Sequence, residues 1–257
     1  MSLSLTTRLF TSVFVATALV ACSGPGPLEG AANNGSFKPV PVSPIIGDVP
    51  LGAEDAPVTV VEYAALTCPH CRDFWKWDFP KLKANYIDTG KVKYIYRDFP
   101  LESDPETGKA ADGLGLLLAS VSRCAGKDKY YAMIDEFFTR QYDVMMAAQS
   151  GNALPVLNEI GAKNGLTSDQ IITCIDHQPE LKASIKKSHD DGAEKGVKGT
   201  PAVFINDVMV ENPTTENIFA AIDAKLGGAT AAATTPAPTA PPAPQPQPAA
   251  PPASPPS

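Results

Sequence analysis

One stretch limits the possible folds of this chain more than any other: residues 58–66 read VTVVEYAAL, an almost unbroken apolar run. A strand covered on both faces has such a run, whereas a strand with one face in solvent alternates between apolar and polar residues. Residues 92–99, VKYIYRDF, alternate like a second strand. Between them, residues 71–87 have helical spacing, which Pro80 is expected to kink. A helix that joins two strands is typical of a right-handed βαβ unit, so the sequence predicts an α/β fold.

A long segment without strands follows. Residues 106–195 show helical patterns separated by Gly, Pro and Asn, and they contain no convincing strand. Strands return at residues 202–205 and 208–210, and the Asn-Asp pair between them is typical of a two-residue hairpin. Helices are expected over residues 110–124, 130–140, 154–164, 168–175, 179–195 and 214–226.

The N-terminal end differs from globular sequence. Residues 1–21 are expected to be a signal peptide, because their apolar run is shorter than the about 20 residues that a membrane-spanning helix needs. The run ends Leu-Val-Ala-Cys22, which resembles the lipobox of bacterial lipoproteins, so Cys22 is expected to carry a lipid at the mature N-terminus. The alternative is a plain secretory signal in which Cys22 has no role. Either signal exports the protein, and outside the cytoplasm cysteines persist as disulfides.

Low-complexity segments flank the expected globular domain, residues 48–226. Residues 22–47 are rich in Gly, Pro, Asn and Ser, as in a flexible tether. Residues 227–257 carry no charged side chain, and half of those from Pro236 onward are Pro, so we expect polyproline II and no packed core there. The net charge of −7 and the lack of a basic stripe argue against a nucleic-acid partner.

The most informative motif is Cys68-Pro69-His70-Cys71, which lies where the first strand ends and the helix begins. Free N–H groups and the positive end of a helix favour an anion, so the Cys68 sulfur is expected to be a thiolate with a lowered pKa. Pro69 suits the first helical turn, and His70 can add a hydrogen bond or a positive charge. A stabilised thiolate stabilises the reduced form, so the disulfide becomes a better oxidant.

A zinc site is the main alternative for a Cys-x-x-Cys pair. Tetrahedral zinc needs two more Cys or His ligands, usually in a second close pair. The other cysteines of the domain, Cys124 and Cys174, are isolated in the sequence, and His177 and His189 form no compact ligand motif. We therefore expect no metal and no cofactor.

Two further residues favour redox chemistry. Glu62 interrupts the apolar run, and a carboxylate there destabilises the fold unless it is used or solvated. If it is buried it can accept the proton of Cys71, whereas a Glu on an edge strand would reach solvent. Pro201 directly precedes an apolar strand, which indicates a special turn with a cis bond. A cis-proline beside the cysteines would leave backbone groups free to pair with an extended substrate segment.

Taken together, the segments VVEYAALTCPHC, RDFPL and VKGTPAVFIN resemble the DsbA family of bacterial periplasmic disulfide oxidoreductases, over roughly residues 48–226. The family has a thioredoxin fold with an α-helical domain inserted between the second and third thioredoxin strands, and the strand-poor residues 106–195 occupy that position. By position, the resemblance implies these roles: nucleophile for Cys68, resolving cysteine for Cys71, buried acid for Glu62 and cis-proline for Pro201.

The resemblance also implies a function. The chain would be an exported oxidase that introduces disulfides into thiol-containing exported proteins and is reoxidised by a membrane partner of the DsbB type. Thr200 departs from the best-known DsbA oxidase, which has Val before its cis-proline, and Thr is common there in isomerase relatives. An isomerase or reductase kept in the reduced state is therefore the alternative. Residues 23–47 are too short for the dimerisation domain of DsbC and DsbG relatives, which favours a monomer.

A non-catalytic binding protein on the same fold is a third hypothesis, but a binding module has no need for an intact reactive pair. DsbA-like relatives often carry a second cysteine pair in the helical domain, which implies a structural disulfide between Cys124 and Cys174. Two separately buried thiols remain the alternative, because nothing in the sequence fixes their distance.

Overall fold

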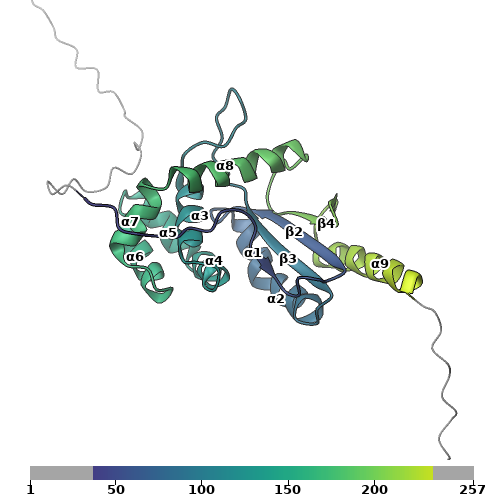
Figure 1. Cartoon of the computed structure of the whole chain (residues 1–257). Helices are drawn as coiled ribbons and strands as arrows, with labels where there is room; N and C mark the ends of the chain where they lie inside the picture. Colours follow the sequence, from purple (N-terminus) through teal and green to yellow (C-terminus); the bar gives the residue numbers. More distant parts are fainter. Residues whose placement is uncertain (1–36, 234–257) are drawn as a thin grey trace, which may run out of the picture.

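The computed structural model describes residues 37–233, with side chains up to residue 227 (Figure 1). The expected signal peptide, residues 1–21, the expected lipid site Cys22 and the Pro-rich residues from 234 onward lie outside the described part. Within it, a sheet and a group of helices build the α/β fold that the sequence predicts. No helix of this part combines the length and the apolar character that crossing a membrane requires.

The sheet places the apolar run of the sequence at its centre, with strand order β1-β3-β2-β4-β5. The central strand β2 (Val58–Ala64) pairs in parallel with β3 (Val92–Asp98) and antiparallel with β4 (Ala202–Ile205). The edges are β1 (Pro50–Leu51) and β5 (Val208–Met209). Nearly all residues of β2 are buried because it has a neighbour on each side and is covered on both faces, which accounts for the unbroken apolar run.

The connection between the two parallel strands is helical but interrupted. It consists of α1 (Pro69–Trp77), α2 (Phe79–Leu82) and a single π-helical turn, η1 (Lys83–Ile87). Pro80 has no N–H to continue the hydrogen bonds of α1, and its ring opposes a continuous helix. The kink that the sequence predicts is therefore a break at Asp78, between two helices.

A helical domain is inserted between β3 and β4, as the sequence predicts, and Figure 1 shows most of its helices grouped to one side of the sheet. The last of them, α8, runs from that group back over the sheet toward β4. One helix of the domain, α5, has no counterpart among the expected helices. The helices of the domain are α3 (Leu114–Cys124), α4 (Tyr130–Thr139), α5 (Gln141–Gln149), α6 (Ala153–Lys163), α7 (Ser168–Asp176) and α8 (Pro179–Glu194).

Helix α8 lies very close to the face of the sheet that carries Tyr63. A Cβ atom added at Gly192 would lie 2.9 Å from the ring of Tyr63 and 3.0 Å from that of Phe99. Gly192 therefore permits a contact that a larger residue would prevent. The two rings belong to a smaller apolar cluster on this face, made up of Val61, Tyr63, Ile95, Phe99, Val197, Ala202 and Phe204.

The C-terminal part agrees with the elements expected from the sequence, except in the last turns of its final helix. Asn206 and Asp207 both have positive φ, as the expected two-residue hairpin requires. The final helix, α9 (Thr215–Ala233), is capped by the Thr214 hydroxyl, which accepts the N–H of Asn217 at 3.3 Å. The helix continues past residue 226, where we expected it to end. The segment is rich in Ala, the residue with the highest helix propensity, which favours this continuation.

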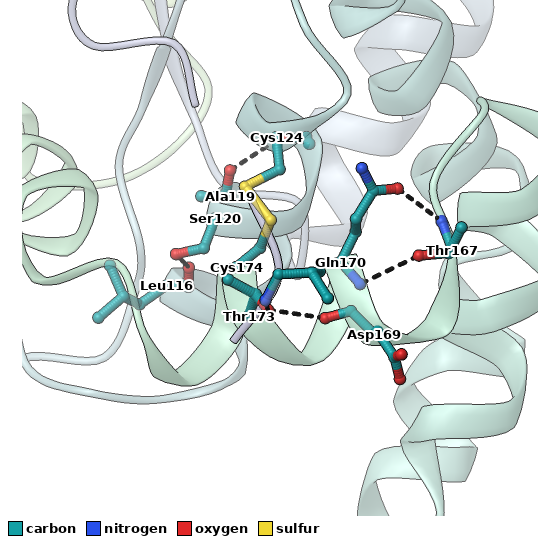
Figure 2. Close-up of a disulfide and its surroundings, with 11 residues drawn as sticks. Leu116, Ala119, Ser120, Cys124, Thr167, Asp169, Gln170, Thr173 and Cys174 are labelled. Atoms are coloured by element: carbon teal, nitrogen blue, oxygen red, sulfur yellow. Dashed lines mark hydrogen bonds between the residues drawn. A yellow bond between two sulfur atoms is a disulfide. The ribbon is translucent and has the colours of Figure 1, made fainter. Parts of the chain in front are cut away.

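Cys124 and Cys174 form a disulfide with an S–S distance of 2.09 Å and a Cα–Cα distance of 6.3 Å (Figure 2). The bond joins the end of α3 to α7. Both side chains are buried. Helix α7 starts with a reciprocal capping box in which Thr167 and Gln170 bond each other's backbone N–H groups. The disulfide therefore links two well-defined helices inside the helical domain.

The described end of the expected tether packs against the domain. Ile45 is buried, and its N–H donates to the carbonyl of Arg123 at 3.1 Å. The Arg123 guanidinium donates in turn to the carbonyl of Gly47 at 2.6 Å and forms a buried ion pair with Asp98 at 2.6 Å. Residues 37–47 thus belong in part to the folded body, because these contacts give their backbone groups partners.

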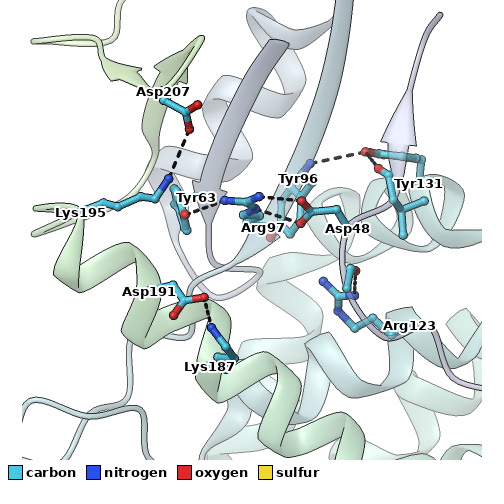
Figure 3. A network of polar contacts seen from close by, with 12 residues as sticks. Asp48, Tyr63, Tyr96, Arg97, Arg123, Tyr131, Lys187, Asp191, Lys195 and Asp207 are labelled. Carbon is cyan, nitrogen blue, oxygen red and sulfur yellow. Dashed lines mark hydrogen bonds and ion pairs between the residues drawn. The ribbon is translucent and has the colours of Figure 1, made fainter. Parts of the chain in front are cut away.

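A second set of contacts ties this segment to the sheet (Figure 3). Arg97 of β3 donates to both oxygens of Asp48, at 2.9 and 2.6 Å, and to the hydroxyl of Tyr63 at 2.9 Å. Tyr131 of α4 donates its hydroxyl proton to the carbonyl of Val49 at 2.6 Å. The strand β1 therefore begins from a segment that is fixed to both the sheet and the helical domain.

Candidate active site

Cys68 is the N-cap of α1, so its sulfur lies among the free N–H groups of the first helical turn. The sulfur accepts the N–H of Cys71 at 3.4 Å and lies 3.3 Å from the carbonyl oxygen of Thr200, to which it donates only when it is protonated. A hydrogen bond from the Cys71 thiol lowers the pKa of Cys68 to about 5, with help from the Thr200 side chain and the amides of Cys71 and His70, against the opposing effect of burial. Cys68 is therefore a thiolate at neutral pH.

Cys71 has the opposite character. Its side chain is completely buried in the first turn of α1. Burial raises the pKa of Cys71 far above its ordinary range, and the hydrogen bond to Cys68 and the charge of Glu62 raise it further. One sulfur of the pair is thus prepared to carry charge and the other is kept protonated. This asymmetry suits a pair in which one cysteine meets the substrate and the other is shielded.

Glu62 lies in the central strand β2, so the alternative of an edge-strand Glu that reaches solvent does not hold. Its side chain is 1% exposed. One carboxylate oxygen accepts the hydroxyl proton of Tyr94, and the other has no hydrogen-bond partner within the described residues. Burial raises the pKa of Glu62 to about 8, although the Tyr94 hydroxyl lowers it. The group can therefore hold or release a proton near neutral pH.

The loop before β4 brings a second segment to the cysteines. The Thr200–Pro201 peptide bond is cis, as the sequence predicts. The Thr200 side chain lowers the pKa of both Cys68 and Cys71. Its buried hydroxyl has no fixed hydrogen-bond partner within the described residues, so it is free to turn toward whichever sulfur carries the charge.

The two residues between the cysteines are exposed. Pro69 occupies the first position of α1, as expected, where its missing N–H is not needed. His70 acts on Cys68 through its backbone N–H. Its imidazole makes no hydrogen bond within residues 37–233, so the direct bond that we expected from it is not formed here. A role for its positive charge stays a prediction.

Gln141, at the start of α5, is a site residue that sequence reasoning missed. Its side chain is 4% exposed. The amide nitrogen donates to the carbonyl of Leu66 at 2.8 Å and to that of Cys68 at 2.9 Å. The helical domain therefore holds the loop that carries the nucleophile. No motif could have revealed this contact, because it depends on where the fold places two backbone carbonyls.

The described residues contain no cluster of three His, Cys, Asp or Glu side chains arranged to hold a metal ion. The site consists instead of two free cysteines, one buried carboxylate and a cis-proline loop. This combination is suited to the exchange of thiols and disulfides, in which a thiolate attacks a disulfide sulfur.

Comparison with known proteins agrees with this chemistry. The thioredoxin family model matches residues 46–224. A putative protein-disulfide oxidoreductase of Rickettsia bellii is 30% identical over 176 residues, which cover 68% of this chain and 63% of the relative. A probable disulfide bond formation protein D of Bacillus cereus is 29% identical over 185 residues, which cover 68% of this chain and 77% of the relative. The chain thus spans less than two thirds of the length of the Rickettsia relative.

A solved structure agrees as well. The crystal structure of Wolbachia pipientis alpha-DsbA1 is 30% identical in sequence and superposes with a TM-score of 0.62, covering 74% of this chain and 96% of that one. The fold of BdbD from Bacillus subtilis is also similar, with a TM-score of 0.59 at 24% identity, covering 73% of this chain and 98% of that one. The family model spans most of the chain and the site has its reactive pair, so this protein belongs to the thioredoxin family, in its DsbA-like branch.

Proposed function

We propose that the protein is a thiol–disulfide oxidoreductase that works as an oxidase. A substrate thiolate attacks the sulfur of Cys68 in the Cys68–Cys71 disulfide, the S–S bond breaks, and Cys71 leaves and takes up a proton. A second substrate thiolate then attacks the substrate sulfur of the mixed disulfide and releases Cys68 as a thiolate. The substrate loses two electrons and gains a disulfide, and the protein gains the two electrons as a dithiol.

The buried carboxyl supplies the proton in this scheme. Glu62 is near enough to Cys71 for its charge to raise the pKa of that thiol. With its own pKa at about 8, Glu62 is mostly protonated at neutral pH and can donate to Cys71 as that sulfur leaves. In the reverse reaction, the same carboxylate accepts the proton when Cys71 attacks a mixed disulfide.

The observation that carries the oxidase proposal is the stabilised thiolate of Cys68. A lowered thiol pKa stabilises the reduced form in proportion to the distance, in pH units, by which this pKa lies below the working pH. At pH 7, a pKa of about 5 therefore contributes about two pH units, or roughly 60 mV for a two-electron couple. The reduction potential of the Cys68–Cys71 disulfide is raised by that amount.

Equilibration with glutathione redox buffers tests the proposal, because it gives the reduction potential of the Cys68–Cys71 pair. We expect a value more oxidising than the roughly −200 to −230 mV of glutaredoxins. A potential near the about −270 mV of thioredoxin would contradict the oxidase role and support a reductase. Thr200 is the residue that keeps the isomerase or reductase alternative open, because Thr before the cis-proline is common in isomerase relatives.

We further propose that the protein is exported, anchored by a lipid on Cys22, and reoxidised by a membrane partner of the DsbB type. Support for export comes from the Cys124–Cys174 disulfide, since such bonds persist in oxidising compartments. Its substrates would be thiol-containing exported proteins. Mass spectrometry of the mature N-terminus tests the anchor: a lipid absent from Cys22 in the native protein would contradict it.

A further inference from the structure

An aromatic groove lies between α1 and the helical domain. Its volume is about 620 Å³, and its walls come from α1, α2, the end of α4 and the start of α5. One of its lining residues, Arg72, directly follows Cys71 in the sequence. Its walls include Arg72, Trp77, Pro80, Phe138, Thr139 and Tyr142.

The rings of this groove are unusually open to solvent, with Trp77 59% exposed and Tyr142 71% exposed. Large aromatic side chains at the surface are typical of binding sites when they gather in one place. Apolar contact alone does not identify the ligand, so the polar groups of the groove decide its chemistry.

The charged groups of the groove already have partners. Arg72 pairs with Asp73 at 2.7 Å, and Asp135 accepts the indole N–H of Trp75 at 2.9 Å. Lys76 lies over the ring of Trp77, with its ammonium 4.5 Å from the ring centre. A charged ligand would have to displace these contacts, so the groove favours an uncharged one.

Three neutral donors of the groove make no hydrogen bond within the part of the chain that the structure describes: the indole N–H of Trp77 and the hydroxyls of Thr139 and Tyr142. The groove therefore offers aromatic faces and neutral donors. Its best ligand presents backbone carbonyls and few N–H groups. A polyproline II segment has this chemistry, because proline lacks an N–H and the extended backbone leaves its carbonyls free.

This chain carries such a segment. Residues 236–257 contain no charged side chain, and half of them are Pro. Pro-rich segments bind aromatic-lined grooves in many proteins because the extended helix is formed in advance, which lowers the entropy lost on binding. We propose that residues 236–257 dock in the aromatic groove of the same chain as a polyproline II helix.

The connection is long enough. Helix α9 starts next to the groove, because the Thr215 hydroxyl donates to Asp78, the residue after Trp77. The 19 residues of α9 then carry the chain about 28 Å away. Residues 234–257 span about 74 Å at 3.1 Å per residue, which leaves more than half of them for the groove after the return path. Tethering of this kind gives an effective concentration on the order of mM, so weak contacts suffice.

The two tryptophans of the chain allow a direct test. Fluorine-labelled tryptophan gives one ¹⁹F resonance for Trp77, which is 59% exposed in the groove, and one for Trp75, which also lines the groove but is only 6% exposed. A Trp77→Phe variant assigns the two signals. The full-length chain is compared with a chain in which residues 236–257 are replaced by a Gly/Ser sequence of equal length. We expect the Trp77 resonance to differ between the two chains and that of Trp75 to differ much less, because its ring is mostly covered.

A matched pair of variants locates the contact. Tyr142→Ala should abolish the difference at Trp77, and it removes little packing because the ring is mostly exposed. Phe37→Ala should preserve the difference, because this partly exposed ring stacks on His177 of the helical domain instead. A synthetic peptide of residues 236–257, added at mM concentration to the Gly/Ser chain, should shift the Trp77 resonance toward its full-length position.

Three outcomes would overturn the proposal. Identical Trp77 resonances in the two chains would show that the segment does not dock. A difference lost on dilution would assign the contact to a second copy of the chain. Equal shifts of Trp75 and Trp77 would indicate a change of the whole fold. Because the readout requires no turnover, it is independent of the proposed oxidase activity.

Discussion

The pKa of Cys68 depends on a geometry that Cys68 does not hold by itself. Its sulfur meets the N–H of Cys71 only while the backbone before α1 keeps its position. Gln141 fixes that backbone from another domain, through two hydrogen bonds to carbonyl oxygens. A neutral amide that touches neither sulfur thus helps to set the acidity of the nucleophile.

Replacement of Gln141 by Leu should therefore act on both stability and chemistry. The buried carbonyl of Leu66 loses its donor, which costs about 1–3 kcal/mol in the free energy of unfolding. The looser loop should also raise the pKa of Cys68 and make the disulfide less oxidising. Thiolate absorbance near 240 nm against pH, together with the reduction potential, measures both effects. Gln149→Leu, an exposed position of the same helix, is the matched control. An unchanged Cys68 pKa would reduce Gln141 to a purely structural residue.

Sequence patterns predict the reactive residues better than the residues that support them. The Cys-x-x-Cys pair, Glu62 and the cis-proline belong to local motifs, and the structure brings them together. The sequence alone does not decide whether Glu62 is buried, because it does not say which strands pair with β2. Gln141 gives no signal at all, since an amide side chain becomes important only through the distant carbonyls that it reaches.

At the scale of elements, the sequence predicts the strands better than it predicts the helices. The three long strands were predicted to within two residues at each end, because burial on both faces leaves an apolar run that has no other explanation. Helix α5 was missed because it buries few side chains: Gln141 and Val144 are its only buried residues, which leaves no apolar stripe in the sequence.

The disulfide between α3 and α7 should be a main source of stability for the helical domain. The double variant Cys124→Ala/Cys174→Ala should lose about 2–5 kcal/mol in the free energy of unfolding, because the cross-link no longer restricts a loop of 50 residues in the unfolded chain. Urea denaturation monitored by circular dichroism gives the value. A variant as stable as the parent chain would mean that loss of the cross-link does not raise the conformational entropy of the unfolded chain enough to affect stability. The double variant leaves no unpaired thiol in this domain, which excludes misplaced disulfides as a cause.

For the whole molecule, the redox state and stability are linked through pH. In the reduced protein, the folded-state pKa of Cys68, about 5, lies below the roughly 8.5 of an unfolded thiol. Ionised Cys68 therefore contributes stability that is fully present above the unfolded pKa and is lost as pH falls through 5. Glu62 has the opposite sign, because its raised pKa gives stability that is lost as pH rises from about 4.5 to 8.

The difference between the two redox states should isolate the Cys68 contribution, since groups that titrate alike in both states cancel. We expect the stability of the reduced form relative to the oxidised form to rise between pH 5 and pH 8. Thermal unfolding of both forms across this range measures it. A Cys68→Ser variant can form neither this thiolate nor the disulfide, so its stability should lack the contribution that Cys68 gives to the reduced parent chain between pH 5 and pH 8. A difference that stays constant with pH in the parent chain would mean that Cys68 is not ionised in the folded state.

The Cys124–Cys174 bond also changes the mechanics of the chain. A force applied between the two ends passes through the S–S bond and bypasses the chain between the two cysteines, which are 50 positions apart in the sequence. At most about 3.3–3.6 Å per residue is available from an extended chain, so the enclosed loop hides roughly 170 Å of contour length. Stretched to its limit, the oxidised protein is shorter by that length than the same chain after reduction, and the helical domain keeps a part that tension cannot unravel.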